Sequence, residues 1–120
     1  MYELTVRDHF DAAHTLRGYD GECSRLHGHT WDVEVTVAGE DLDNVGIVYD
    51  FKRLKAELRT VLDDYDHVFL DEVRPFDDLN PTAENLARVI HERLTDSIEG
   101  TAVLEVTVWE SPVARLTYRP

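Results

Sequence analysis

The sequence is poor in cysteine and in basic residues, and it contains no long hydrophobic run. A single cysteine, Cys23, excludes an intramolecular disulfide, which agrees with a reducing compartment. No apolar run approaches the length of a membrane span, and the first residues, MYELTVRDHF, lack the pattern of a signal peptide. These absences predict a cytoplasmic protein that has no disulfide cross-link and is not embedded in a membrane.

The charge balance is strongly acidic. Only 12 Lys and Arg residues stand against 25 Asp and Glu residues, which gives a net charge of −13. Such a surface repels nucleic-acid backbones and anionic membranes, so neither is expected as a direct partner. The acids are spread along the chain rather than gathered in a tail. This spread favours adaptation to a very salty cytoplasm, in which screening removes self-repulsion, and it predicts a melting temperature that rises steeply with added salt.

The hydrophobic pattern predicts one α+β domain over residues 1–120. Alternating apolar residues predict strands, and stripes of helical period predict helices. The expected strands are 2–14, 29–37, 103–110 and 114–118, and the expected helices are 50–62 and 82–98. The first strand is expected to be strained or bulged near Asp8. The order ββααββ favours an antiparallel four-stranded sheet with both helices on one face. Its open edges invite pairing between subunits, so an oligomer is expected.

Both helices are predicted from a cap and an apolar stripe. Asp50 can cap the first helix, and Thr82, which follows Pro81, is the predicted N-cap of the second. The two stripes are Phe51, Leu54, Leu58, Val61 and Leu62, and then Leu86, Val89, Ile90, Leu94 and Ile98. Gly100 is expected to stop the second helix. The acidic segment 63–81 between the helices is expected to be irregular.

Three histidines carry the first chemical signal. His27 and His29 are two residues apart in an extended segment, so both imidazoles point to the same side. His14 ends the preceding strand on its buried face and would lie near them if the two strands pair as a hairpin. Three neutral imidazoles with an open fourth position predict a catalytic zinc site, because a structural zinc site has four protein ligands and these usually include cysteine. The alternative is three unrelated histidines, because His-x-His spacing is easily fortuitous. His9 and His91 are interpreted as structural.

Further residues could supply acid, base and binding groups. Cys23 is close enough along the chain to face the metal as a thiolate base or nucleophile, or it is an inert thiol. Asp66 can orient His67 for general acid/base work, or the two form a solvated surface pair. Glu110 ends a strand on its apolar side and could accept two N–H bonds from a pterin or guanine edge, unless the strand has already ended. Thr82 could add a hydroxyl to the same pocket.

Together these motifs resemble the 6-pyruvoyl-tetrahydropterin synthase and 6-carboxy-tetrahydropterin synthase family. The matching segments follow the family's order along nearly the whole chain: Phe10–His14, Cys23–His29, Asp66-His67, Pro81–Asn85 and Glu110. The resemblance implies a tunnelling fold, in which subunits form a trimer around a β-barrel and two trimers stack into a homohexamer.

The resemblance also implies zinc ligands, proton-transfer groups and a pterin anchor. These are, in that order, His14, His27 and His29; Cys23, Asp66 and His67; and Glu110. The cysteine would take a proton from the substrate side chain. The Asp–His pair would act as a relay supplied across a subunit interface.

The spacing Cys-x-x-x-His-Gly-His and the compact length are similar to the 6-carboxy-tetrahydropterin synthases of the deazapurine pathway. The similarity implies zinc-dependent carbon–carbon cleavage of 7,8-dihydroneopterin triphosphate to 6-carboxytetrahydropterin, acetaldehyde and triphosphate, toward queuosine or archaeosine in transfer RNA. One alternative is 6-pyruvoyl-tetrahydropterin synthase, which eliminates triphosphate but keeps the side-chain carbons. Another is a non-catalytic zinc- or pterin-binding oligomer. Family members that act as dihydroneopterin aldolases carry Glu where Ser24 stands, which counts against that role. Arg25 and Lys52 are the candidate cations for the triphosphate.

Overall fold

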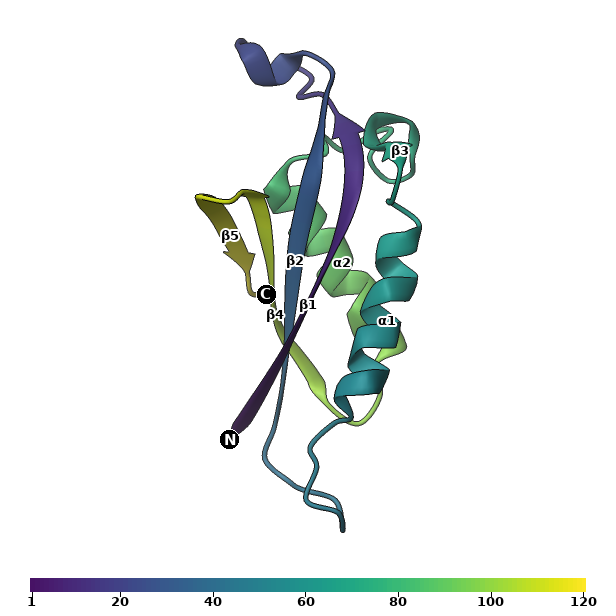
Figure 1. Cartoon of the computed structure of the whole chain (residues 1–120), viewed down its shortest axis with the longest axis vertical. Helices are drawn as coiled ribbons and strands as arrows, with labels where there is room; N and C mark the ends of the chain where they lie inside the picture. The colour runs from purple at the N-terminus through teal and green to yellow at the C-terminus, as the bar shows by residue number, and fades with distance from the viewer.

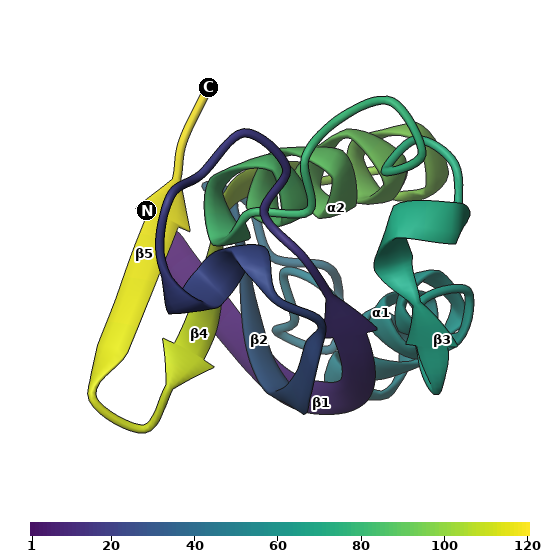
Figure 2. The same ribbon diagram turned by 90° about the horizontal axis from the view of Figure 1, so that it is seen from above.

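The computed structural model describes residues 1–120, apart from the side chain of Cys23. Its elements are β1 (Tyr2–His14), η1 (Glu22–Ser24), β2 (His27–Gly39), α1 (Phe51–Asp63), β3 (Val68–Phe69), η2 (Leu70–Glu72), α2 (Ala83–Ser97), β4 (Ala102–Ser111) and β5 (Ala114–Tyr118). The strands form one sheet in the order β3-β1-β2-β4-β5, and both helices cover the same face of it (Figures 1 and 2). The molecule is elongated, with extents of 53 × 24 × 22 Å. No helix in the described residues is long and apolar enough to cross a membrane.

Strands β1 and β2 form a long antiparallel hairpin with an unbroken register. Pairing runs from Tyr2 opposite Gly39 to His14 opposite His27 without a shift. The bulge expected near Asp8 is therefore wrong, because β2 supplies a partner for every residue of β1. An unbroken register keeps the side-chain alternation in phase from one end of the hairpin to the other.

The irregularities lie in β4 instead. Its register against β5 shifts between Trp109 and Ser111, and its register against β2 shifts between Thr36 and Val37 of β2. The first shift leaves Glu110 as the extra residue at a β-bulge. Bulges are common near the ends and edges of sheets, and this one leaves Glu110 without a partner in β5.

The α+β class is confirmed, but the sheet is mixed and has a fifth strand. Val68–Phe69 pairs in parallel with Ala12 and Ala13 inside the segment expected to be irregular. The element order is therefore ββαβαββ. Two residues are too few to show an alternating pattern, so this strand could not be predicted from the hydrophobic periodicity. Beyond this short pairing, the outer edge of β1 has no strand partner within the described chain.

The helix caps are as predicted, and one residue of the first stripe is not. Asp50 accepts a hydrogen bond from the backbone of Lys52 at 2.9 Å, and Thr82 accepts one from the backbone of Asn85 at 3.1 Å. The buried residues of α1 are Leu54, Leu58, Val61 and Leu62. Phe51, the first residue of α1, is by contrast 53% exposed and lines a surface hollow with Tyr2 and Leu4 of β1.

Candidate metal centre and substrate pocket

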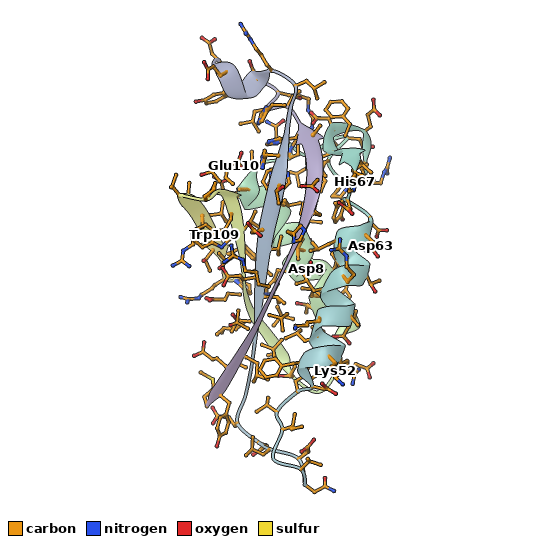
Figure 3. All side chains as sticks on the ribbon, viewed as in Figure 1. Asp8, Lys52, Asp63, His67, Trp109 and Glu110 are labelled. Carbon is orange, nitrogen blue, oxygen red and sulfur yellow. The ribbon has the colours of Figure 1, made fainter. Side chains whose placement is uncertain are left out.

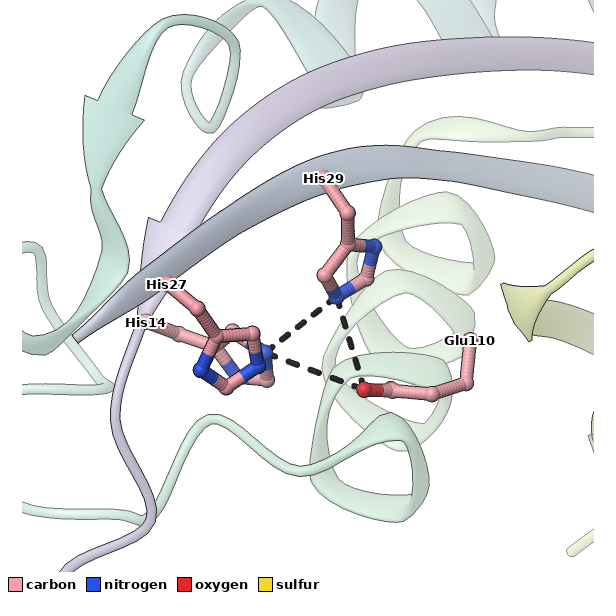
Figure 4. A group of neighbouring side chains, drawn as sticks. All are labelled: His14, His27, His29 and Glu110. Atoms are coloured by element: carbon pink, nitrogen blue, oxygen red, sulfur yellow. Dashed lines mark hydrogen bonds and ion pairs between the residues drawn. The ribbon is translucent and has the colours of Figure 1, made fainter. Parts of the chain in front are cut away.

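Three imidazoles and one carboxylate converge on the helix-covered face of the sheet (Figure 4). They belong to His14, His27, His29 and Glu110, whose possible ligand atoms all lie within 4.8 Å of one another. The hairpin register explains the meeting of the histidines. His14 lies directly opposite His27, and His29 lies opposite Ala12, two residues earlier on β1 and on the same face. The Nε2 atoms of His14 and His29 are 3.2 Å apart.

Each imidazole is oriented by a backbone carbonyl. The Nδ1 atoms donate over 2.8 to 3.0 Å, from His14 to Pro81, from His27 to Arg25 and from His29 to Thr30. A carbonyl oxygen can only accept, so these bonds place the ring proton on Nδ1. In the neutral form of each ring the Nε2 lone pair can therefore bind a cation, and the possible ligand atoms of the cluster lie close together. Metal-binding histidines in proteins are held by second hydrogen bonds of this kind.

Glu110 lies against two of the three imidazoles. Its Oε1 atom is 3.4 Å from Nε2 of His29 and 3.8 Å from Nε2 of His14. The hydrogen bond to Glu110 raises the pKa of His29 against the effect of burial. Burial opposes ionisation of Glu110, but His29 and the neighbouring imidazoles still lower its pKa. Burial lowers the pKa of His14, which keeps that ring neutral and able to bind a cation.

A cavity of about 360 Å³ opens beside this cluster. His14, Thr82 and Glu110 line it, together with the apolar side chains of Leu16 and Leu116. Thr82 comes from the start of α2, and Glu110 comes from the β4 bulge. The structure thus brings together the two predicted substrate-binding residues and a predicted metal ligand in one cavity. Its volume is that of a small-molecule site.

Trp31 packs against two histidines of the cluster, a contact that was not predicted from the sequence. The side chain is fully buried, and its ring centre lies 4.2 Å from that of His29 and 4.7 Å from that of His14. Its Nε1 is buried without a hydrogen-bond partner among the described residues. The available signal was its position two residues after His29, which puts both side chains on the same face of β2.

Asp66 and His67 form a separate cluster with Asp11. His67 Nδ1 lies 2.9 Å from the Asp66 carboxylate, which also accepts a hydrogen bond from the backbone of Asp11 at 3.0 Å. The bond from Asp11, and then the contact with His67, lower the pKa of Asp66. The His67 side chain is 76% exposed and lies beside β3, whereas Glu110 lies across the sheet on β4 (Figure 3). Within one chain the pair is thus not part of the His/Glu cluster.

The remaining candidates divide by position. The Cys23 side chain lies outside the described residues, so its predicted role stays a prediction. Arg25 supplies the carbonyl that orients His27. Lys52 lies toward the opposite end of the long axis from Glu110 and thus far from the cluster within one chain, so its role in binding triphosphate stays a prediction (Figure 3).

The fold and the cluster define an α+β protein with a candidate metal centre beside a small-molecule cavity. The model of the 6-pyruvoyl tetrahydropterin synthase family matches residues 3–120, and the chain belongs to this family. It is 38% identical to the 6-carboxy-5,6,7,8-tetrahydropterin synthase of Bacillus subtilis, over 99% of this chain and 86% of that protein. It is also 38% identical to a dihydroneopterin monophosphate aldolase of Pyrococcus furiosus, over 89% and 88% of the two chains. The solved structure of Caenorhabditis elegans 6-pyruvoyl tetrahydropterin synthase has a TM-score of 0.90 and 32% identity, over 99% of this chain and 95% of that one.

Proposed function

We propose that residues 1–120 act as one domain and function as a zinc-dependent 6-carboxy-5,6,7,8-tetrahydropterin synthase. The reaction converts 7,8-dihydroneopterin triphosphate and water to 6-carboxytetrahydropterin, acetaldehyde and triphosphate, and its product would serve deazapurine bases of transfer RNA. The observation that carries the proposal is the convergence of three oriented imidazoles with Glu110 beside a cavity of about 360 Å³. The 38% identity to a Bacillus subtilis protein named for this activity supports the choice of reaction.

The donor set suits zinc. Neutral imidazole nitrogens are common zinc ligands, and His14, His27 and His29 present three of them with their tautomers already fixed. When bound, zinc would act as a Lewis acid that polarises side-chain oxygens of the substrate. Glu110 has a different task in the proposal, so that the fourth position stays open for substrate.

Glu110 and Thr82 would hold the pterin ring. The lowered pKa of Glu110 keeps the carboxylate ionised at neutral pH, so it can accept two N–H bonds from the amino-pyrimidine edge of a pterin. Thr82 offers a hydroxyl in the same cavity, and Leu16 and Leu116 offer apolar surface for the ring. These contacts fix the ring and leave the side chain of the substrate facing the imidazoles.

Proton transfer is assigned to Cys23, Asp66 and His67. Cys23 would take a proton from the substrate side chain, and the Asp66 carboxylate would hold the His67 imidazole for the return of a proton. His67 is highly exposed and separate from its own histidine cluster, which supports a role for the pair in a neighbouring copy of the chain. From the resemblance to the family we propose a homohexamer of two stacked trimers, which light scattering would detect as six times the chain mass.

A second candidate function is 6-pyruvoyl-tetrahydropterin synthase. The favouring observation is the TM-score of 0.90 to a Caenorhabditis elegans protein of that name. Incubation of the zinc-loaded protein with dihydroneopterin triphosphate, followed by mass spectrometry, separates the possibilities. Acetaldehyde and a 6-carboxy product support the first function, and a pterin that keeps its three-carbon chain supports the second. Absence of turnover would contradict both and leave a binding protein.

The zinc site is tested by metal analysis of a His29→Ala variant. Loss of a ligand should lower the bound zinc well below one per chain and abolish turnover. His9→Ala is the matched control, because His9 lies on β1 with an exposed side chain outside the cluster. Undiminished zinc in the His29 variant would refute the ligand set. A Cys23→Ala variant with full activity would refute the role assigned to the cysteine.

A further inference from the structure

A hydrogen-bonded clamp joins the chain just after His14 to the segment 71–80. The Asp71 carboxylate accepts bonds from the Thr15 backbone N–H at 2.9 Å, from the Thr15 hydroxyl at 2.5 Å and from Arg17 Nη1 at 2.9 Å. The Asp71 side chain is only 8% exposed. Three donors on one nearly buried carboxylate, two of them from the residue that follows a proposed zinc ligand, hold that residue firmly in place.

Arg17 and Asn80 extend the clamp. Arg17 Nη2 donates to the carbonyl of Phe76 at 2.9 Å. The Asn80 side chain accepts from the Arg17 backbone N–H at 3.0 Å and donates to the Arg17 carbonyl at 2.7 Å. Asn80 immediately precedes Pro81, whose carbonyl orients His14. The imidazole of His14 and the carbonyl that orients it are therefore held by one network of hydrogen bonds.

We propose that Asp71 is a positioning residue for the metal centre, acting through Thr15 and Arg17 to keep the His14 imidazole bonded to the Pro81 carbonyl. Asp71 touches neither metal nor substrate. It fixes the two segments that meet at His14, and the same two segments carry Leu16 and Thr82 into the substrate cavity. The inference rests on the proposed zinc site, and it adds a group outside the ligand set on which zinc affinity depends.

The test compares Asp71→Asn with Asp77→Asn. Both remove one negative charge from the same segment, but Asp77 is more exposed, and among the described side chains its ion pair is with Arg74, at 3.5 Å. In metal-free protein, proton NMR of labelled histidine would follow exchange of the His14 Nδ1 proton. We expect this exchange to be at least tenfold faster in Asp71→Asn and unchanged in Asp77→Asn. Zinc affinity, measured against a competing chelator, should fall by roughly 10- to 100-fold in Asp71→Asn alone.

A Thr15→Val variant provides a second measurement if Asp71→Asn folds poorly. It removes one of the three bonds to the carboxylate and conserves shape, so it should show a smaller change in the same direction. Equal exchange and equal zinc affinity in wild type and Asp71→Asn would overturn the proposal. So would equal losses in both Asp variants, because charge rather than position would then be responsible. A wild type that binds no zinc would refute the proposed function, whereas the exchange of the His14 proton would still decide whether Asp71 positions the ring.

Discussion

Replacement of Glu110 by Gln should separate substrate recognition from metal binding. Glu110 lies within ligand distance of the histidine cluster, so it is either the anchor of the pterin ring or a fourth ligand that closes the site. The amide keeps the shape of the side chain but cannot accept two N–H bonds as a carboxylate does. A hydrogen bond to a charged group contributes about 1.5–3 kcal/mol, which corresponds to roughly 10- to 150-fold in affinity. We expect neopterin, an unreactive pterin, to bind more weakly by this factor.

Calorimetric titration with neopterin measures the pterin affinity, and chelator competition measures zinc in the same preparations. Zinc binding should change little in Glu110→Gln, because three imidazoles remain. The control is Glu105→Gln, since Glu105 lies on the same strand but pairs with Arg119 away from the cluster. Loss of zinc together with unchanged pterin affinity would refute the reasoning, because Glu110 would then be a metal ligand rather than the ring anchor.

Three further predictions concern the fold. Leu58→Ala should lower the free energy of unfolding in urea by about 2–5 kcal/mol, because Leu58 is fully buried. Phe51→Ala should lower it by less than about 1 kcal/mol, because Phe51 is 53% exposed. A larger loss for Phe51→Ala would contradict the position of α1. Thr82→Ala should cost about 1 kcal/mol in the same assay through loss of the cap of α2, and an unchanged midpoint would refute the cap. Burial and a hydrogen bond to a carboxylate raise the pKa of Tyr49 from 10.0 to about 12. Between these pH values the folded chain keeps a proton that the unfolded chain loses. The free energy of unfolding should therefore fall as the pH rises through this range. This loss should be smaller in Tyr49→Phe, whereas Tyr2→Phe, at an exposed residue, should behave as wild type.

Much of the site could be predicted because the alternation of side chains between the two faces of a strand depends on that strand alone. His27 and His29 share a face whatever the sheet does, and His14 joins them once the hairpin closes in the register that buries Phe10 and Trp31. The face on which Glu110 lies could also be predicted from the alternation along its strand. The alternation could not predict the bulge at Glu110, because a bulge depends on how β4 pairs with β5 rather than on β4 alone.

Other features depended on contacts between distant segments. β3 exists only because Val68–Phe69 lies against Ala12 and Ala13, and two residues have no period of their own. The hydrogen bonds from Thr15 to Asp71 join residues 56 positions apart. The sequence alone therefore could not distinguish Asp71 from the other acidic residues of its segment. Phe51 satisfied the helical period, but the period does not encode whether other segments cover the first turn of a helix.

The origin of the cluster in two parts of the chain has a consequence for partial unfolding. The three histidines belong to a single hairpin, β1 and β2, whereas Glu110 arrives from β4 near the end of the chain. Under the proposed function, zinc binding would depend on this hairpin and on the segment 71–81 that holds His14, whereas recognition of the pterin ring would also need β4. If β4 separated from β2, the imidazoles would stay together while the carboxylate moved away, so the proposed zinc site would persist and the proposed pterin anchor would be lost.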